Sequence, residues 1–587
     1  MYAVFRIMFT SDARPQESVE AVRAVFADSG LPVILSGEPY LQSEIFSYVY
    51  QIVTRLPPIA LFLILLVFRL RIGSLLATIL SLVPAVVGAI LTLGTIGWII
   101  GGISIMSALV PIFVIVIGSA DGLHVTSHVM DRLEAGDDSI TAMTSTLKAV
   151  GLPVVLTTLT TMAGFFSLTL INSDAIAELG IVAAFGVLVA GIATWIILPA
   201  ILLMVHPRRR HRPQRGALTV RVLSSVRGIP ALAATLVLIL AAVPGALRVE
   251  SNFSMIDIYK PATEIRQNIE AASAILGGSI PVYVTFDQGD ALSPEAAAPV
   301  LELQDQLMDA GVVGRSVSVY SLIRDLWSRA GQAGDFPPDA GAAENLLAQL
   351  PFDAEEMRTG FTADDGRGRA VFFLRDLDSS TLQTLEDVVE QVSSRYDRQL
   401  QPVGTAFVMK EMNDQIIHQQ LGALLLAIVV TFLLITLTQR SLSAGLLSTL
   451  PILITLIVMF GVMGYAGIAL SVITAIMSGL TIGVGIDYSI HYVSLLRYER
   501  KRNSSQPSVT ALHYVATPVL ANAAGLAIGF TAMAFSPMQI HVTLSVLMWV
   551  TMMTSALLSL TLLPTIASWS ERGRQATNAA ANDTPDA

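Results

Sequence analysis

Long apolar stretches dominate this sequence and restrict what the chain can fold into. Each could cross the roughly 30 Å hydrocarbon core of a bilayer as a helix, and only 14% of the 587 residues are charged, against about a quarter in a soluble domain. We therefore predict a polytopic α-helical membrane protein with about eleven spans. The spans are predicted at 50–69, 73–98, 102–128, 149–172 and 178–205, then at 229–247, 416–438, 443–466, 468–496, 515–536 and 540–568.

A segment of soluble composition separates the two clusters of spans. Ile280–Phe286 and Ala370–Leu374 are β-like runs, whereas Pro294–Met308 and Thr381–Val392 have helical periodicity. Together they predict an α+β domain outside the membrane. The predicted parts are the C-terminal remnant of a first outer domain at 1–46, a bundle of five helices at 47–207, a basic linker at 208–228, the first helix of a second repeat at 229–247, a second outer domain at 248–413, five more helices at 414–570 and a disordered tail at 571–587.

Arginine and lysine gather in alternate connections between the spans. Under the positive-inside rule these connections face the cytoplasm. The other connections are short and neutral or acidic, so they and the α+β domain face outward. We therefore expect an inner-membrane protein whose large domain is periplasmic. The basic connections contain Arg69 and Arg71, Arg132 and Lys148, Arg208–Arg210, Arg440, Arg497–Arg502 and Arg572.

The two halves of the chain repeat each other at a nearly constant offset. Both run in the same direction, which predicts two parallel repeats of six helices. The first repeat lacks its first helix and most of its outer domain in this sequence, so we expect the intact protein to begin farther upstream and to have about twelve spans. The matched positions are residues 2–20 with 370–387, Pro84 with Pro451, Gly97 with Gly464, Asp121 with Asp487, Pro153 with Pro518 and Gly164 with Gly529.

Asp121 and Asp487 are the two obvious carboxylates at depth in the apolar spans. A charged carboxylate there costs at least about 2.5–3.5 kcal/mol on insertion scales, and burial favours its protonated form. Because the two lie at equivalent positions of the repeats, we predict that they face each other and carry protons. The alternative is a polar pair that fixes helix packing through hydrogen bonds.

The residues that follow the two acids differ between the halves. Tyr488 follows Asp487 and could donate a hydrogen bond to Asp121, whereas its counterpart is Gly122. The predicted relay is therefore asymmetric. Small residues near both acids would let helices approach closely; they are Gly118, Gly483 and Gly485.

Further polar residues lie on or near the helix faces that carry the acids. His124 and His491 each follow an Asp by about one turn, which indicates either a proton exit path or a solvated helix end. Hydroxyls and an amide in the following spans could relay protons through water or bond the helix backbone instead. These residues are Thr157, Thr158, Thr160, Thr161 and Asn522.

Several other chemistries lack their sequence signals. The chain has no cysteine and a net charge of −10, so thiolate metal sites are excluded and nothing points to nucleic acid. No phosphate-binding glycine loop followed by Lys-Ser/Thr occurs. No His, Asp and Glu set outside the membrane has metal-ligand spacing. We therefore expect a secondary transporter that uses a proton gradient, with no cofactor or metal, rather than an enzyme.

The sequence resembles a known family at several motifs. GVGIDYSIHYVSLLRYE at 483–499 resembles the fourth-helix signature of resistance-nodulation-division permeases, in the branch of MMPL proteins and hopanoid transporters. TTLTTMAGFFSL at 157–168 and GFTAMAFSPM at 529–538 resemble the helices that follow it. The resemblance implies twelve helices, porter-like periplasmic domains and proton-driven export. In this branch Asp-Tyr pairs form the proton relay, which Asp121, Asp487 and Tyr488 match and from which Gly122 departs.

We accordingly expect an exporter of hydrophobic or lipid-like molecules, driven by the proton-motive force. The alternatives are a multidrug efflux permease, an export factor like the Sec accessory proteins, and a lipid- or sterol-responsive membrane sensor without net transport. Membrane lipids are expected partners. The resemblance is compatible with a homo-oligomer (dimer or trimer) and with a periplasmic partner, and the sequence identifies neither.

Overall fold

The structure is a computed structural model. It describes residues 14–27, 33–207, 223, 225, 227–250, 254, 256–278, 281–287, 292–349, 367–376, 378–502 and 504–582. The predicted repeat segment at 2–13 and the arginines at 208–215 lie outside these residues. The chain divides into two compact units: residues 1–47 with 252–414, and residues 48–251 with 415–587.

The first unit is built around a four-stranded antiparallel sheet with the order β2-β3-β1-β4. Val284 of β1 pairs with Ala370 of β3 on one side and with Pro402 of β4 on the other. The strands are β1 (Pro281–Phe286), β2 (Val313–Val317), β3 (Gly368–Leu374) and β4 (Leu400–Val403). The helices are α1 (Pro15–Ala27), α9 (Glu264–Leu276), α10 (Pro294–Asp309), α11 (Val319–Arg329), α12 (Ala340–Leu347) and α14 (Ser379–Tyr396).

Alternating burial on the strands forms the core of this unit. In β3 every second residue is buried, so Ala370, Phe372 and Leu374 face a cluster that includes Leu303 of α10 and Leu385 of α14. This period of two is what one covered face of a sheet requires. The predicted strands and helices of this region are therefore present. The sequence did not predict β2 and β4, which are short.

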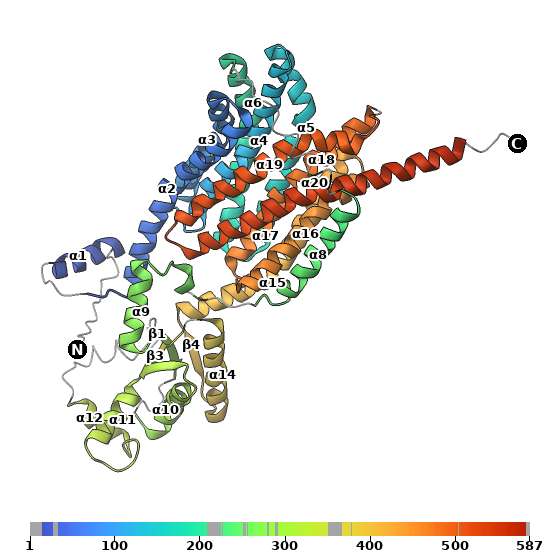
Figure 1. Cartoon of the computed structure of the whole chain (residues 1–587). Helices are drawn as coiled ribbons and strands as arrows, with labels where there is room; N and C mark the ends of the chain where they lie inside the picture. Colours follow the sequence, from blue (N-terminus) through green and yellow to red (C-terminus); the bar gives the residue numbers. More distant parts are fainter. Residues whose placement is uncertain are drawn as a thin grey trace. The chain divides into compact units, whose positions relative to one another are not determined.

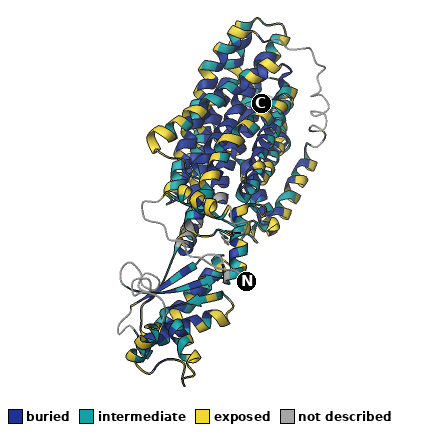
Figure 2. Ribbon diagram, turned by 90° about the vertical axis from the view of Figure 1, so that its left-hand side faces the viewer, coloured by how far each residue is buried: buried dark blue, intermediate teal, exposed yellow. Residues whose placement is uncertain are grey.

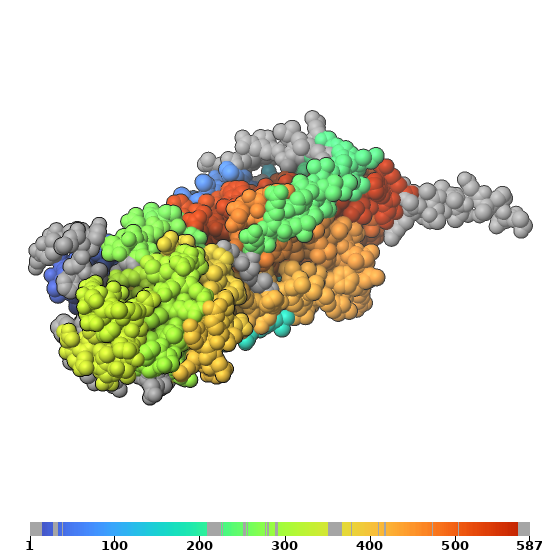
Figure 3. Space-filling model, turned by 90° about the horizontal axis from the view of Figure 1, so that it is seen from below, coloured from blue at the N-terminus to red at the C-terminus, as the bar shows by residue number. Residues whose placement is uncertain are grey.

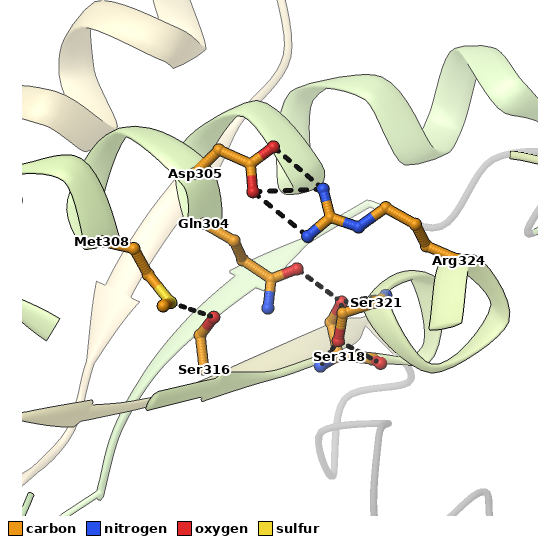
Figure 4. Close-up of polar contacts among 7 residues, drawn as sticks. All are labelled: Gln304, Asp305, Met308, Ser316, Ser318, Ser321 and Arg324. Carbon is orange, nitrogen blue, oxygen red and sulfur yellow. Dashed lines mark hydrogen bonds and ion pairs between the residues drawn. The ribbon is translucent and has the colours of Figure 1, made fainter. Parts of the chain in front are cut away.

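Polar contacts fix α10 to the turn that follows β2 (Figure 4). Ser318 is the N-cap of α11 and forms a capping box with Ser321. Its hydroxyl also donates to Oε1 of Gln304, at 2.9 Å. On the same side, Arg324 donates to both carboxylate oxygens of Asp305. These bonds position α11 against α10.

The second unit is a bundle of long apolar helices, and ten helices among the described residues are long and apolar enough to cross a membrane (Figure 1). Buried residues line their inner faces (Figure 2). In the first half the bundle has α2 (Glu38–Ile72), α3 (Leu75–Thr95), α4 (Val110–Glu134), α5 (Ser139–Phe166) and α6 (Asp174–Val205). In the second half it has α8 (Ile229–Ala246), α15 (Thr405–Gln439), α16 (Leu442–Ala466), α17 (Val472–Gly485), α18 (Asp487–Lys501), α19 (Pro507–Phe530) and α20 (Gln539–Asn582).

Two expectations about the spans need correction. The span predicted at 468–496 is two helices, because α17 ends at Gly485 and α18 begins at Asp487, and neither is long enough to count among the ten. The tail predicted to be disordered from residue 571 is helical as far as Asn582. Ala-rich sequence has high helix propensity, and it continues the preceding apolar helix.

Small residues let α8 lie directly on α16. A Cβ at Gly464 would lie 1.8 Å from the carbonyl oxygen of Gly245, and one at Gly461 would lie 2.6 Å from that of Ala242. The hydroxyl of Tyr465 donates to the Ala241 carbonyl across the same contact, at 2.8 Å. Figure 3 shows α8 as a green band against the orange and red residues of the later helices.

Candidate functional site

The helix α4 brings Asp121 into the interior of the bundle. This helix is buried on all sides, because every residue from Val110 to Ser127 is buried. A helix of this kind is central in its bundle. Asp121 is only 9% exposed, so its carboxyl group must find hydrogen-bond donors within the protein.

Those donors come from α5. The hydroxyl of Thr157 lies 3.1 Å from Oδ1 of Asp121, and that of Thr158 lies 3.3 Å from Oδ2. Both hydroxyls also lie within 2.9 Å of the Val154 carbonyl oxygen. Each threonine can therefore donate either to the acid or to its own backbone. The sequence left two roles open for these threonines, a proton relay and a bond to their own backbone. The two roles differ in where the hydroxyl hydrogen of each threonine points.

Asp487 is held differently. It is 4% exposed, and its Oδ1 has no hydrogen-bond partner among the residues that the structure describes. Its carboxylate is close enough to Asp121 for the two to repel each other when both are charged. One site with two such carboxylates favours a state in which at least one proton is bound.

The predicted hydrogen bond from Tyr488 to Asp121 is wrong. The Tyr488 hydroxyl instead lies 3.4 Å from the sulfur of Met552 on α20. Because successive residues of a helix point in different directions, Tyr488 faces α20 while Asp487 faces the first half. Tyr488 is fully buried and lies within electrostatic reach of Asp487 rather than in a bond to the opposite acid.

Gly122 has a steric reason to differ from Tyr488. A Cβ at this position would lie 1.9 Å from the carbonyl oxygen of Ser81 on α3. The two helix backbones therefore meet here, and no side chain fits. The departure of Gly122 from the Asp-Tyr pattern follows from the packing of α3 on α4.

The two histidines meet across the bundle. The rings of His124 and His491 stack with their centroids 4.0 Å apart, and both residues are 7% exposed. Nε2 of His124 is buried and has no hydrogen-bond partner within the described part of the chain. The reading of both residues as solvated helix ends is therefore wrong, and a role in proton movement stays a prediction.

The remaining predicted residues divide into three groups. Thr160 bonds only carbonyls of its own helix among the contacts that the structure describes. Thr161 donates to the Gly483 carbonyl of α17, at 3.0 Å. Asn522 is fully buried, and neither amide atom has a partner in the described ranges.

Close helix contacts surround the acids as the small residues predict. A Cβ at Gly164 would lie 2.7 Å from the Gly479 carbonyl oxygen and 3.0 Å from Cα of Gly483. A Cβ at Gly118 would lie 2.9 Å from Cβ of Ala190. The helix α5 of the first half is thus fixed against α17 of the second.

Sequence reasoning missed the contribution of α20. Besides Met552, this helix places the Ser555 hydroxyl on the Gly485 carbonyl and the Ser559 hydroxyl 2.9 Å from that of Ser489. The signal was the spacing of four between Ser555 and Ser559, which puts two hydroxyls on one face of an apolar helix. Among the described residues, no group of three or more His, Asp and Glu side chains could hold a metal ion.

Known proteins resemble this chain over the segments that form the site. The sequence model described as the MMPL family matches residues 5–232 and 257–581. These two stretches contain both acids, both histidines and the threonine series.

Two curated relatives have names that state a cargo. The "Mycolic acid-containing lipids exporter MmpL11" of Mycolicibacterium smegmatis is 29% identical over 321 residues, which is 50% of this chain and 33% of the relative. The "Heme uptake protein MmpL11" of Mycobacterium tuberculosis is 25% identical over 476 residues, 75% of this chain and 45% of the relative. The chain thus spans less than half the length of either protein.

Proposed function

Because the chain belongs to the MMPL family of the resistance-nodulation-division superfamily, we propose that this multi-pass membrane protein is a proton-motive-force-driven exporter of hydrophobic or lipid-like molecules. The observation that carries the proposal is the pair of buried carboxylates, Asp121 and Asp487, within electrostatic reach of each other. Their repulsion when charged links proton binding to the relative position of the two helices that hold them.

The proposed coupling uses the unequal surroundings of the two acids. Asp121 can accept from two threonine hydroxyls, which stabilise its charged form. Oδ1 of Asp487 has no such donor among the described residues, so the proton is held there when one is bound. Release of that proton restores the repulsion and moves α18 relative to α4. The stacked histidines lie on the route from the acids toward the basic connections.

We also propose that the two halves are parallel repeats, on the basis of packing. Helix α5, which follows the helix of Asp121, packs on α17. Helix α19, which follows the helix of Asp487, packs on α4. This reciprocal arrangement is typical of a pseudo-two-fold axis. Gly94 and Gly97 match the glycines under α8, and a Cβ at either position would meet no atom of the described residues within 4 Å. We propose that an equivalent of α8 would pack on this open face of α3.

The cargo and the cellular location are parts of the same proposal. One relative's name states lipid export and another's states heme uptake, and both cargoes are large and hydrophobic. Basic residues in alternate connections favour an inner-membrane protein with its α+β domain in the periplasm. A lipid cargo agrees with the family and with this location.

A lipid profile of separated inner and outer membranes tests the proposal. The gene would be deleted and then restored as the native form, as Asp487→Asn, or as Asp309→Asn, a matched change at an exposed helix end. We expect one lipid class to accumulate in the inner membrane and to be cleared by the native and Asp309→Asn forms only. Clearance by Asp487→Asn would exclude the acid as the coupling group, and unchanged profiles would exclude lipid cargo.

A further inference from the structure

Two arginines from distant segments converge at the end of the bundle where basic residues gather. Arg227 lies two residues before the start of α8, and the residue between them, Gly228, donates its backbone N–H to the Thr565 hydroxyl of α20, at 3.0 Å. Arg500 is near the end of α18. Its Nη2 lies 3.5 Å from the Ala567 carbonyl oxygen of α20, two residues beyond Thr565, so the two arginines border the same stretch of α20. We call Arg227 and Arg500 the arginine cluster.

The arginine cluster contains N–H groups that lack acceptors. Nε and Nη1 of Arg227 and Nε of Arg500 are closed to solvent and have no hydrogen-bond partner among the described residues. A guanidinium group stays charged at any relevant pH. A buried donor without an acceptor costs about 1–3 kcal/mol, and more when it is charged. The site is therefore incomplete without an acceptor from outside these residues.

Among the described residues, Glu571 is the carboxylate that forms an ion pair with Arg500, and it is already engaged. Oε2 of Glu571 accepts from the Ser508 hydroxyl at 2.9 Å. Its Oε1 lies 3.4 Å from Nη2 of Arg500, a long contact. The Glu571 carboxylate thus leaves the buried N–H groups of both arginines without an acceptor among the described residues. The N-terminus of α19 adds to the positive potential, because its N-cap Gln506 provides no side-chain hydrogen bond.

Aromatic side chains indicate the depth of the site in the membrane. Trp569 is two residues from Glu571 and 47% exposed, and Tyr498 is two residues from Arg500 and 49% exposed. Exposed Trp and Tyr are typical of the membrane–water interface, at the level of lipid headgroups. An acceptor at this depth is most readily the headgroup of a lipid.

We propose that the arginine cluster binds the phosphate group of an anionic phospholipid from the cytoplasmic leaflet. Phosphate oxygens accept strongly from guanidinium N–H groups, and basic sites between spans on the cytoplasmic side suit anionic headgroups. The bound phosphate balances the excess positive charge and joins the start of α8 to α18 and α20. This site goes beyond export, since it is separate from the carboxylate pair.

Native mass spectrometry of the purified full chain in detergent tests the site. The probes are phosphatidylglycerol, phosphatidylcholine and inorganic phosphate. The variants are Arg227→Gln, Arg500→Gln and, as a control with the same charge change, Arg502→Gln, whose guanidinium group lies 5.6 Å from the ring centre of Tyr498. We expect saturable phosphatidylglycerol binding that weakens at least about tenfold in the first two variants and is unchanged in the control.

Each other outcome overturns the proposal in a distinct way. Equal binding of phosphatidylcholine, or equal loss in Arg502→Gln, would show nonspecific attraction. Displacement of the lipid by inorganic phosphate at equal concentration would identify free phosphate as the ligand. Undiminished binding in Arg227→Lys and Arg500→Lys as well as in the Gln variants would exclude both arginines. Circular dichroism identifies any variant that fails to fold, and the Lys forms then provide the comparison.

Discussion

The imidazole rings of His124 and His491 stack with centroids 4.0 Å apart and planes 24° from parallel. The contact joins α4 to α18, the helices that carry Asp121 and Asp487. Two charged imidazolium rings at this distance would repel each other strongly in a buried site. The stacked arrangement therefore requires that at least one ring is neutral, and protonation of both would separate the helices.

Replacing His491 distinguishes the packing of its ring from its ability to bind a proton. His491→Phe keeps a ring against His124 but cannot bind a proton, so we expect wild-type stability and a transport rate that depends less on pH than that of the native protein. His491→Ala should lose both the stability that the ring contact provides and the proton-binding group. The measurement is substrate flux in proteoliposomes at a series of pH values. A normal pH profile in His491→Phe would remove the histidines from the proton path.

Gly122 tests the close contact between α3 and α4. Gly122→Ala places a Cβ where the Ser81 carbonyl oxygen lies, so one helix must move and we expect a loss of about 1–3 kcal/mol, as for overpacking in a core. Gly422→Ala is the matched control, because Gly422 lies within α15 and its Cβ would meet no atom of the described residues within 4 Å. Thermal unfolding in detergent measures both. Equal melting temperatures for the two variants would contradict the contact.

Replacing Asn522 tests whether stability and transport depend on the same side chain. Its buried amide has no partner among the described residues, so Asn522→Leu should stabilise the protein by about 1–3 kcal/mol, the cost of leaving such groups unpaired. If water bound to this amide takes part in proton movement, transport should fall at the same time. Unfolding and flux would be measured on the same preparation. A variant that is stabilised and still fully active would assign Asn522 no role in transport.

Tyr320 gives the α+β domain a dependence on high pH. Burial raises its pKa to about 12, whereas in the unfolded chain it titrates near about 10. Its contribution to stability is thus complete below pH 10 and is lost as the pH rises toward 12. Tyr320→Phe, which keeps the contact with Phe286, should unfold with a weaker pH dependence in that window. Fluorescence of Trp327, the one tryptophan between residues 252 and 414, reports the transition, and parallel profiles would contradict the assignment.

The sequence predicted which residues would be buried together more successfully than how they would be oriented. Hydrophobic length located the helices, and repeat spacing brought Asp121 and Asp487 within reach of each other. Neither of these sequence signals predicts the rotation of each helix about its axis. Tyr488 therefore contacts Met552 rather than Asp121, because the packing of α18 on α20 sets that rotation.

Local geometry that depends on a neighbouring helix was also beyond prediction. The contact between Gly122 and Ser81 requires knowledge of how closely α3 approaches α4. The strands β2 and β4 were missed because five and four residues are too few to establish an alternating pattern. The break between α17 and α18 at Ile486 was not predicted, because no Pro lies there.

That interruption determines how motion can pass through the second half. The segment before it is anchored, since the Gly483 carbonyl accepts from Thr161 of α5, and the Gly485 carbonyl accepts from Ser555. The segment after it begins with Asp487 and carries Tyr488 and His491 on one rigid helix. Ile486 joins the two segments. A small rotation about Ile486 would move the far end of α18, at Arg500, through a longer arc than Asp487 travels, so a change at the carboxylates would produce a larger displacement at the basic end of the helix.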